Sequence, residues 1–396
     1  MDTAPATRCV DDVVGKHADD LVQLRRDLHA HPELSWHETR TTDLVVNSLD
    51  AVGYRISRLP RTGLVAEIGD QAPVIALRAD LDALPVDDTT GDPWASRVDG
   101  VAHACGHDVH TAGLVGAALA LAEVYAAGLL PGRVRLLFQP AEEVMPGGAH
   151  EMVNFGALDD VERIFCVHCD PTVDVGQVGL REGAVTGAAD SLGVTLTGSG
   201  GHTSRPHLTE DLTFALAKVV TEVPAVLSRR LDPRAGVSVV FGRINAGTAN
   251  NVVPQTGTVG GTVRMLDPVA WAEAEGIVRA AIDDLVRPYG VSAAVDYRRG
   301  VPPVVNDAGS IAMLGLAVDD ALGAGGRTGT SQSLGGEDFG WYRDKVPGAL
   351  ARLGTRSPGG PTYDLHQGNL RIDEQATLIA ARLLANVAIR AFVTTG

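Results

Sequence analysis

VRLLFQPAEE, residues 134–143, begins as a short and largely apolar strand and ends in two adjacent carboxylates, Glu142 and Glu143. Pro140 ends the strand because proline has no backbone N–H to donate to a sheet. A buried strand that leads directly into charged side chains is typical of an α/β fold, where ligands gather at the carboxyl ends of the strands. This segment therefore indicates both a type of fold and the place of a functional site.

The first part of the chain alternates strands with helices. Branched aliphatic residues predict strands over residues 64–68, 74–77 and 164–167. An Ala- and Leu-rich segment predicts a helix over residues 111–127, and leucines at helical spacing predict an opening helix over residues 12–30. Strands alternating with helices imply a mostly parallel sheet covered on both faces. We therefore expect an α/β domain.

The middle of the chain has a different pattern. Segments 192–198, 237–245 and 257–264 alternate apolar residues with Thr, Ser or Gly, as half-buried antiparallel strands do. Helices predicted over residues 209–229 and 268–287 separate these segments. The resulting β-α-β-β-α-β order is the one expected of a small ferredoxin-like α+β sandwich.

The two patterns divide the chain. The α/β pattern resumes after the ferredoxin-like one, with two further predicted helices. We predict that residues 187–297 form a domain inserted into a discontinuous domain made of residues 1–186 and 298–396. The length of 396 residues exceeds what one hydrophobic core usually supports, which agrees with two domains.

Charge and composition argue against several classes of partner. A formal net charge of −16 at pH 7 argues against a nucleic-acid partner, because phosphate binding needs a basic surface. The most apolar stretch, residues 112–122, is too short to span a bilayer, so we expect a buried helix and no membrane partner. The first thirty residues contain no apolar leader, and four cysteines in so long a chain are not a disulfide framework. We expect a cytoplasmic protein with reduced thiols.

The turn Cys105-Gly106-His107 is a candidate metal site. A thiolate and an imidazole two residues apart, in a turn freed by glycine, can converge on one ion. We expect the next helix to begin near His110 or Thr111, so that its N-terminus favours an anionic thiolate. The alternative is an inert buried cysteine beside a hydrogen-bonded histidine.

Other candidate ligands follow predicted strands. Adjacent side chains on extended backbone point in different directions, so either Glu142 or Glu143 can bind a metal while the other takes a proton from water. The alternative is a solvated carboxylate pair. His168 closes the strand predicted over residues 164–167, and His366 precedes the last predicted helix. Each histidine is either a ligand or a hydrogen-bonded core residue.

Two further motifs leave their roles open. Asp80-Leu81-Asp82 offers a ligand or a carboxylate that orients an imidazole, and a loop-capping role is the alternative for Asp80. Cys166 and Cys169 form a C-x-x-C pattern, which also occurs in redox dithiols and zinc sites. A structural zinc would need a second cysteine pair, and a redox dithiol normally sits at a helix N-terminus. A redox protein is therefore the alternative from a different class.

Nine short motifs occur along nearly the whole chain in one order. They are LHAHPELS (28–35), RADLDALP (78–85), HACGHD (103–108), QPAEE (139–143), GGH (200–202) with PH (206–207), GTANNVVP (247–254), GTVR (261–264), GEDF (336–339) and LH (365–366). Together they resemble the aminoacylase and carboxypeptidase-G-type metallopeptidases. The closer resemblance is to the amidohydrolase branch that contains hippurate hydrolase and the indole-acetyl-amino-acid hydrolases.

That resemblance implies a zinc-peptidase-like catalytic domain with two divalent metal ions per subunit. The implied metal ligands are Cys105, His107, Glu143, His168 and His366. Cys105 is implied to bridge the two ions, and a thiolate ligand suits zinc, with manganese next and cobalt or nickel as alternatives. The implied reaction is metal-dependent hydrolysis of the amide bond of N-acyl amino acids. A dipeptidase or carboxypeptidase of the same superfamily is the alternative.

The resemblance also implies roles for residues that do not bind metal. Glu142 is the implied general base and later general acid, and Asp82 is a carboxylate that supports the site. In the inserted lid and dimerisation domain, His202 and Asn251 approach the scissile carbonyl, and Arg264 binds the substrate carboxylate. The resemblance further implies a homodimer, in which His202 acts either within its own subunit or across the dimer.

Overall fold

The chain, described over residues 2–394 in a computed structural model, divides into two compact units. Unit 1 comprises Met1–Gly183, Val305–Ser331 and Trp341–Gly396, and unit 2 comprises Ala184–Val304 and Gln332–Gly340. The insert predicted from the sequence, residues 187–297, was too short at both ends and lacked the segment 332–340. That segment groups with unit 2 because the Ser333 N–H donates to the Val185 carbonyl at 2.9 Å and the Gly187 N–H donates to the Gly335 carbonyl at 3.2 Å.

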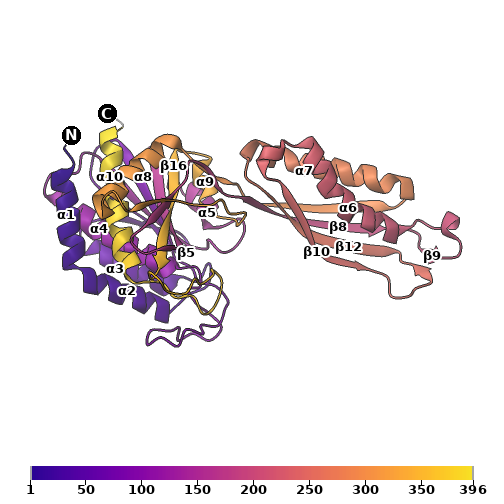
Figure 1. The fold of residues 1–396 in the computed structure, drawn as a ribbon, viewed down its shortest axis with the longest axis horizontal. Helices are drawn as coiled ribbons and strands as arrows, with labels where there is room; N and C mark the ends of the chain where they lie inside the picture. The colour runs from indigo at the N-terminus through magenta and orange to yellow at the C-terminus, as the bar shows by residue number, and fades with distance from the viewer. Residues whose placement is uncertain (1, 395–396) are drawn as a thin grey trace. The chain divides into compact units, whose positions relative to one another are not determined.

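Unit 1 is built on an eight-stranded sheet in the order β1-β2-β4-β3-β5-β16-β6-β15. Figure 1 labels two of its strands, β5 and β16. Its strands are β1 (Arg55–Arg58), β2 (Leu64–Ile68), β3 (Val74–Asp80), β4 (Arg133–Gln139), β5 (Val161–Asp174), β6 (Val178–Leu180), β15 (Arg327–Gly329) and β16 (Gly348–Arg356). The four central strands, β4, β3, β5 and β16, run parallel to one another, whereas β2 and β6 pair antiparallel with β4 and β16 at either side of them. This confirms the mostly parallel sheet predicted from the sequence.

Long apolar helices pack on one another and on this sheet. The helices of the unit are α1 (Ala4–Lys16), α2 (Ala18–Ala30), α3 (Thr39–Asp50), α4 (His107–Ala126), α5 (Gly148–Asn154), α8 (Ala308–Leu322), α9 (Gly340–Arg343) and α10 (Gln375–Thr394). One helix was predicted over residues 12–30, but the chain breaks at His17 into α1 and α2. The break lets Val10 of α1 and Leu21 of α2 both enter the same buried cluster.

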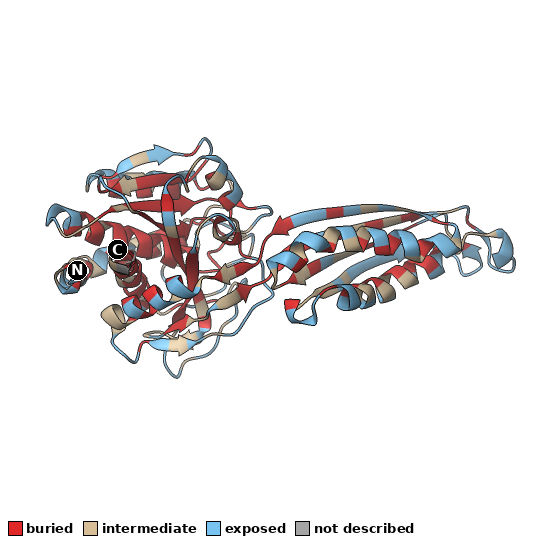
Figure 2. Ribbon diagram, turned by 90° about the horizontal axis from the view of Figure 1, so that it is seen from above, coloured by how far each residue is buried: buried red, intermediate tan, exposed pale blue. Residues whose placement is uncertain are grey.

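Among residues 2–394, two helices, α4 and α10, are long and apolar enough by length and composition to cross a membrane. The 20-residue α4 extends beyond the apolar stretch 112–122, so the expectation that it is too short was wrong. In both helices 78% of the apolar window is buried inside the protein. Figure 2 shows the same burial along the interior of unit 1, and it confirms the prediction of a buried helix here.

Unit 2 contains a four-stranded antiparallel sheet in the order β10-β12-β8-β13. Its elements are β8 (Ala188–Thr197), α6 (Leu212–Arg230), β10 (Ser238–Ala246), β12 (Thr256–Met265), α7 (Pro268–Val286) and β13 (Ser292–Val301). Leu192, Val194 and Leu196 alternate along β8 on the face that the helices cover. This is the predicted ferredoxin-like arrangement, which the alternating pattern identified correctly.

Side chains at the helix starts of unit 2 fix where α6 and α7 begin. The carboxylate of Asp211 accepts the Phe214 N–H at 3.1 Å, and that of Asp267 accepts the Ala270 N–H at 2.8 Å. Each cap satisfies an amide that has no partner within its helix.

The remaining short elements are β7 (Gly183–Thr186), β9 (Gly201–His202), β11 (Val252–Val253), β14 (Val304–Asn306) and the 3₁₀ turns Pro206–Leu208, Pro233–Ala235 and Arg287–Tyr289.

Candidate metal centre

The Cys105-Gly106-His107 turn leads directly into α4, which begins at His107. The sequence expected this helix to begin at His110 or Thr111, so that expectation was wrong. Gly106 has φ 86°, and a Cβ atom there would lie 2.8 Å from the Sγ atom of Cys169. Both the backbone conformation and the space therefore require glycine. The glycine lets a thiol and an imidazole enter the site on either side of one tight turn.

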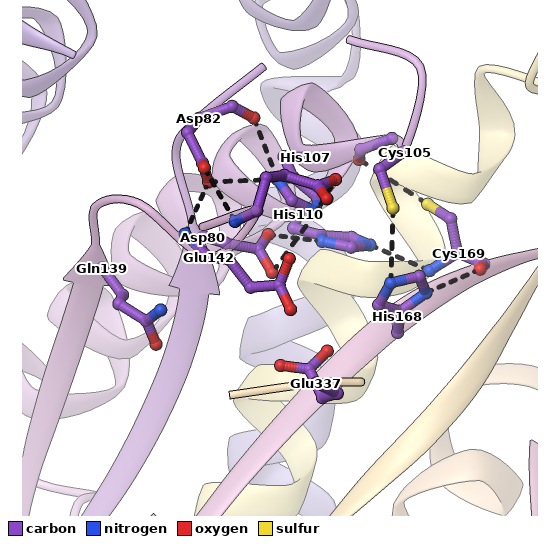
Figure 3. A network of polar contacts seen from close by, with 12 residues as sticks. Asp80, Asp82, Cys105, His107, His110, Gln139, Glu142, His168, Cys169 and Glu337 are labelled. Carbon is purple, nitrogen blue, oxygen red and sulfur yellow. Dashed lines mark hydrogen bonds and ion pairs between the residues drawn. The ribbon is translucent and has the colours of Figure 1, made fainter. Parts of the chain in front are cut away.

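Cys105, His107 and His168 form the first group of converging side chains (Figure 3). One potential ligand atom from each lies within 4.8 Å of the others, and all three residues are buried. The Cys105 Sγ atom is 3.6 Å from the His168 Nε2 atom. His168 lies inside β5, which continues to Asp174, and not at a strand end as the sequence predicted. The strand was expected to be shorter because the residues after Val167 are polar.

Hydrogen bonds to backbone oxygens orient both imidazoles. The Nδ1 atom of His107 lies 2.9 Å from the Asp82 carbonyl, and that of His168 lies 2.8 Å from the Cys169 carbonyl. A carbonyl oxygen only accepts, so in each neutral ring Nδ1 carries the proton. The Nε2 atom of each ring is thereby left with a free lone pair, which is the form that binds metal.

Cys105, Glu143 and His366 form a second group within the same 4.8 Å criterion. The Glu143 Oε1 atom is 3.8 Å from the Nε2 atom of His107 and 3.5 Å from that of His366. His366 has φ 62°, and its N–H donates to the Ala104 carbonyl at 2.7 Å. The backbone of His366 is thus held against the turn that carries Cys105. The two groups have Cys105 in common.

These residues fit a pair of metal ions. Within residues 2–394, the His107 Nε2 and Glu143 Oε1 atoms are buried and have no hydrogen-bond partner. A buried polar atom without a partner is costly, and a cation among them would satisfy both. Thiolate, imidazole and carboxylate together are the donor set that zinc prefers. One ion beside His107 and His168 and another beside Glu143 and His366 would place Cys105 between them.

The ionisation of Cys105 differs from the sequence-based expectation. Burial raises the pKa of the Cys105 thiol, although His107 counteracts this in part. The sequence suggested that the start of α4 holds Cys105 as a thiolate. The raised pKa shows that the start of α4 does not do so by itself. A thiol must lose its proton to bind a metal, so ligation by Cys105 must be accompanied by proton release.

Asp82 supports the two adjacent glutamates through their backbone. Its carboxylate accepts the N–H groups of Glu142 and Glu143, both at 3.0 Å, and the Ser35 hydroxyl at 2.7 Å. Burial alone would raise the pKa of Asp82, but hydrogen bonds from His107 and from the Glu143 backbone lower it overall. Both Asp82 oxygens are thus engaged within the protein. This arrangement is that of a supporting carboxylate, the role that the family resemblance implied for Asp82.

Glu38 is a second buried carboxylate that the sequence did not single out. Its Oε1 atom accepts the Ala141 N–H at 2.8 Å, and its Oε2 atom accepts the Thr62 hydroxyl at 2.6 Å. Ala141 has φ 54°, an uncommon conformation for alanine that needs outside support. Glu38 and Asp82 therefore fix three successive amides, at residues 141–143. Glu142 lies within this fixed turn, in a group with His107 and Glu143.

Comparison with known proteins shows the family of this chain. The sequence profile of Peptidase family M20/M25/M40 matches residues 76–390. The chain belongs to peptidase family M20/M25/M40. It is 36% identical over 374 residues to the N-acetylcysteine deacetylase of Bacillus subtilis, covering 93% of this chain and 96% of that protein. Membership confirms the predicted family and makes the protein a hydrolase of amide bonds.

A solved structure of the same family is similar to this chain along nearly its whole length. The chain resembles the Bacillus subtilis protein YxeP, described as a dinuclear metal-binding peptidase of the M20 family, with a TM-score of 0.82 and 33% identity. The match covers 95% of this chain and 98% of YxeP.

A Rhodococcus jostii protein named as a glutamate–cysteine ligase is 48% identical over 366 residues. The chain spans 46% of that longer protein and 92% of its own length.

The redox alternative has no support in this M20 protein. The four cysteines, each inside the described part of the chain, form no disulfide. Cys166 and Cys169 both lie in β5, three residues apart. Successive strand residues alternate between faces, so side chains three apart point to opposite sides of the sheet. The C-x-x-C pattern is therefore not a dithiol site.

The predicted substrate residues of the M20 protein all lie in unit 2. His202, in β9, pairs with Val252 of β11, and the Thr203 N–H donates to the Asn251 carbonyl at 3.1 Å. The structure thus brings His202 and Asn251 together, and both are exposed. Arg264, in β12, donates from Nη1 to the Leu334 carbonyl at 2.6 Å.

Proposed function

We propose that this M20 protein hydrolyses the amide bond of N-acyl amino acids at a pair of divalent metal ions. The observation that carries the proposal is the convergence of two ligand groups on Cys105. Beside them lies Glu142, a carboxylate that the sequence did not assign to a metal. The deacetylase name of the Bacillus relative supports an N-acyl amino acid as substrate.

Cys105, His107, Glu143, His168 and His366 are the residues proposed to hold the metals. When bound, the ions supply Lewis acidity toward the amide carbonyl and lower the pKa of a water molecule. Glu142 takes the proton of that water and delivers it to the leaving amine nitrogen. Asp82 and Glu38 keep the turn in place, so that the Glu142 carboxylate does not move away from the reacting atoms.

The contacts of the substrate are a further part of the proposal. His202 donates a hydrogen bond to the oxygen that becomes negative, a type of contact that lowers the barrier by about 3 kcal/mol. Asn251 assists at the same carbonyl. Arg264 binds the carboxylate of the amino-acid portion.

We also propose a homodimer, supported by the exposed edge strand β10 with Val240 and Ile244 on its surface. A cytoplasmic location is proposed as well, supported by thiols that form no disulfide.

Replacing Arg264 by Ala is expected to raise KM for substrates that carry a carboxylate by about 10- to 100-fold. The reason is that a hydrogen bond to a charged group contributes about 1.5–3 kcal/mol. The KM should not change for the matching substrates in which an uncharged carboxamide replaces the terminal carboxylate. Arg243→Ala in the neighbouring strand β10 is the control. An unchanged KM for carboxylates removes Arg264 from the substrate site.

Metal analysis combined with a substrate panel tests the proposed function. The protein is freed of metal, loaded separately with zinc, manganese, cobalt or nickel, and assayed with N-acetyl and N-benzoyl amino acids and with dipeptides. We expect two ions per chain and fastest turnover of an N-acyl amino acid. Turnover of dipeptides alone would favour the dipeptidase or carboxypeptidase alternative. A fully loaded protein that cleaves no amide in the panel contradicts the proposal.

A further inference from the structure

His110 is a buried histidine next to the metal centre whose two ring nitrogens are both engaged. Its Nδ1 atom lies 2.6 Å from the Asp80 Oδ1 atom, and its Nε2 atom lies 2.8 Å from the Cys169 backbone nitrogen. A backbone N–H only donates, so Nε2 is the acceptor and Nδ1 carries the proton that Asp80 accepts. His110 is 1% exposed and lies on the face of α4 that also carries His107.

The backbone of Cys169 joins His110 to His168. The Cys169 N–H donates to His110, and the Cys169 carbonyl accepts the Nδ1 proton of His168 at 2.8 Å. This second bond determines which nitrogen of His168 is free. The free Nε2 atom lies 3.6 Å from the Cys105 Sγ atom. Figure 3 shows the unbroken line of contacts from Asp80 through His110 to His168.

Asp80 is itself fixed, so it can act as the anchor of this line. Its Oδ2 atom lies 2.6 Å from Nη1 of Arg78, and both side chains are fully buried. The Thr111 hydroxyl donates to the Asp80 backbone carbonyl at 2.8 Å. The carboxylate is thus charge-paired on one oxygen and hydrogen-bonded by His110 on the other. A buried ion pair with its remaining atoms satisfied is rigid, because separating it leaves an uncompensated charge.

Asp80, His107 and His110 also lie within 4.8 Å of one another, which raises the question of a third metal site. His110 cannot serve as a ligand there, since a neutral imidazole has one acceptor nitrogen and Cys169 already occupies it. The Asp80 oxygens are engaged by Arg78 and His110. The contacts of this group are those of a support.

We propose that Asp80 and His110 are positioning residues that hold the Nε2 atom of His168 toward the metal centre through the backbone of Cys169. The inference rests on the proposed metal-dependent function, because His168 must be a ligand for its orientation to matter. His110 is therefore expected to affect the binding of only one of the two ions. That ion is the one beside Cys105, His107 and His168.

Two substitutions of His110 separate the two contacts. In His110→Gln the side-chain oxygen can still accept the Cys169 N–H, whereas in His110→Asn the shorter amide can still donate to Asp80 but does not reach Cys169. Binding of zinc to the metal-free full chain is measured by competition with a chromophoric chelator. We expect His110→Asn to bind one zinc normally and the second about 10- to 100-fold more weakly, as for other residues that support a ligand. His110→Gln, which keeps the contact to Cys169 and loses the contact to Asp80, should bind the second zinc more tightly than His110→Asn and more weakly than the wild type.

Spectra and a matched control distinguish positioning from general damage. The thiolate-to-cobalt absorption of the cobalt-loaded protein should change more in His110→Asn than in His110→Gln. His17→Asn is the control, because His17 forms a surface pair with Asp20 at 3.3 Å. Thermal unfolding of each metal-free variant reports stability separately. If His110→Asn does not fold, Asp80→Asn takes its place, with the same single ion expected to weaken.

The possible outcomes differ for the inference and for the function beneath it. Equal zinc affinities in wild type and His110→Asn, or equal losses in the Asn and Gln variants, would overturn the positioning role. Unchanged binding of both ions in Asp80→Asn would do the same. A wild-type chain that binds no zinc, cobalt, manganese or nickel would instead contradict the proposed metal-dependent function.

Discussion

Glu142→Gln is expected to lower kcat by about 10²- to 10⁴-fold, the usual contribution of a general acid–base group. Glutamine has nearly the shape of glutamate but cannot take a proton from water. Glu142 is 9% exposed and is held by its backbone N–H on Asp82, so its replacement by an amide leaves the turn intact. Metal content should therefore stay at the wild-type level while turnover is lost.

The ratio of metal content to turnover makes this test specific. Glu143→Gln, one residue along, is expected to lose metal, because Glu143 contacts both His107 and His366. Glu182→Gln, at an exposed position, serves as the control for the chemical change alone. Both quantities are measured on the same preparation, by metal analysis and by initial rates on an N-acyl amino acid. Near-normal kcat in a fully loaded Glu142→Gln protein shows that another group is the base.

The fold could be predicted well where a hydrophobic pattern determines it. The strand at residues 64–68 has the predicted bounds, and the alternation along residues 192–198 correctly indicated an antiparallel sheet. The prediction failed where polar residues are buried. Helix α4 begins with His107 and Asp108, which a hydrophobic pattern cannot distinguish from a loop. Strand β5 likewise continues through His168, although its apolar run ends at Val167.

Buried polar residues at these places have partners far away in the sequence. The Asp108 carboxylate forms an ion pair with Arg25 at 2.7 Å and a hydrogen bond with His29 at 2.8 Å, and neither contact can be inferred from local sequence. Glu38 was missed for the same reason, since its partners are at residues 62 and 141. His110 left one usable signal. It lies three residues after His107, a spacing that places both rings on one face of a helix.

Several candidate ligands could be named from the sequence because Cys105 and His107 flank a glycine turn and Glu142 and Glu143 follow a strand. The structure brings Cys105, His107, Glu142, Glu143, His168 and His366 together from four separate parts of unit 1. Parallel strands explain this convergence, since the carboxyl ends of β3 and β4 meet at one edge. The tautomers of the histidines could not be predicted, because they depend on the carbonyls of Asp82 and Cys169.

Cys105→Ser is expected to weaken the binding of both metal ions, whereas substitutions of His110 are expected to weaken the binding of one. Cys105 is the residue that belongs to both ligand groups, so its loss removes a donor from each. A serine hydroxyl is a much weaker ligand for zinc, which prefers thiolate sulfur. The loss of zinc affinity should exceed the about 10- to 100-fold typical of residues that only support a ligand. Zinc titration of the metal-free chain measures it.

Cysteines elsewhere in the chain provide the controls for this substitution. Cys9→Ser, in α1 and outside the ligand groups, should keep two ions and full activity. Burial holds the Cys105 thiol in its protonated form, with a raised pKa, so zinc binding to the wild type must release that proton. Cys105→Ser should therefore release fewer protons per zinc bound, measured in a weakly buffered indicator solution. If the serine variant binds two zinc ions with wild-type affinity and proton release, Cys105 is not a ligand and the thiolate bridge is wrong.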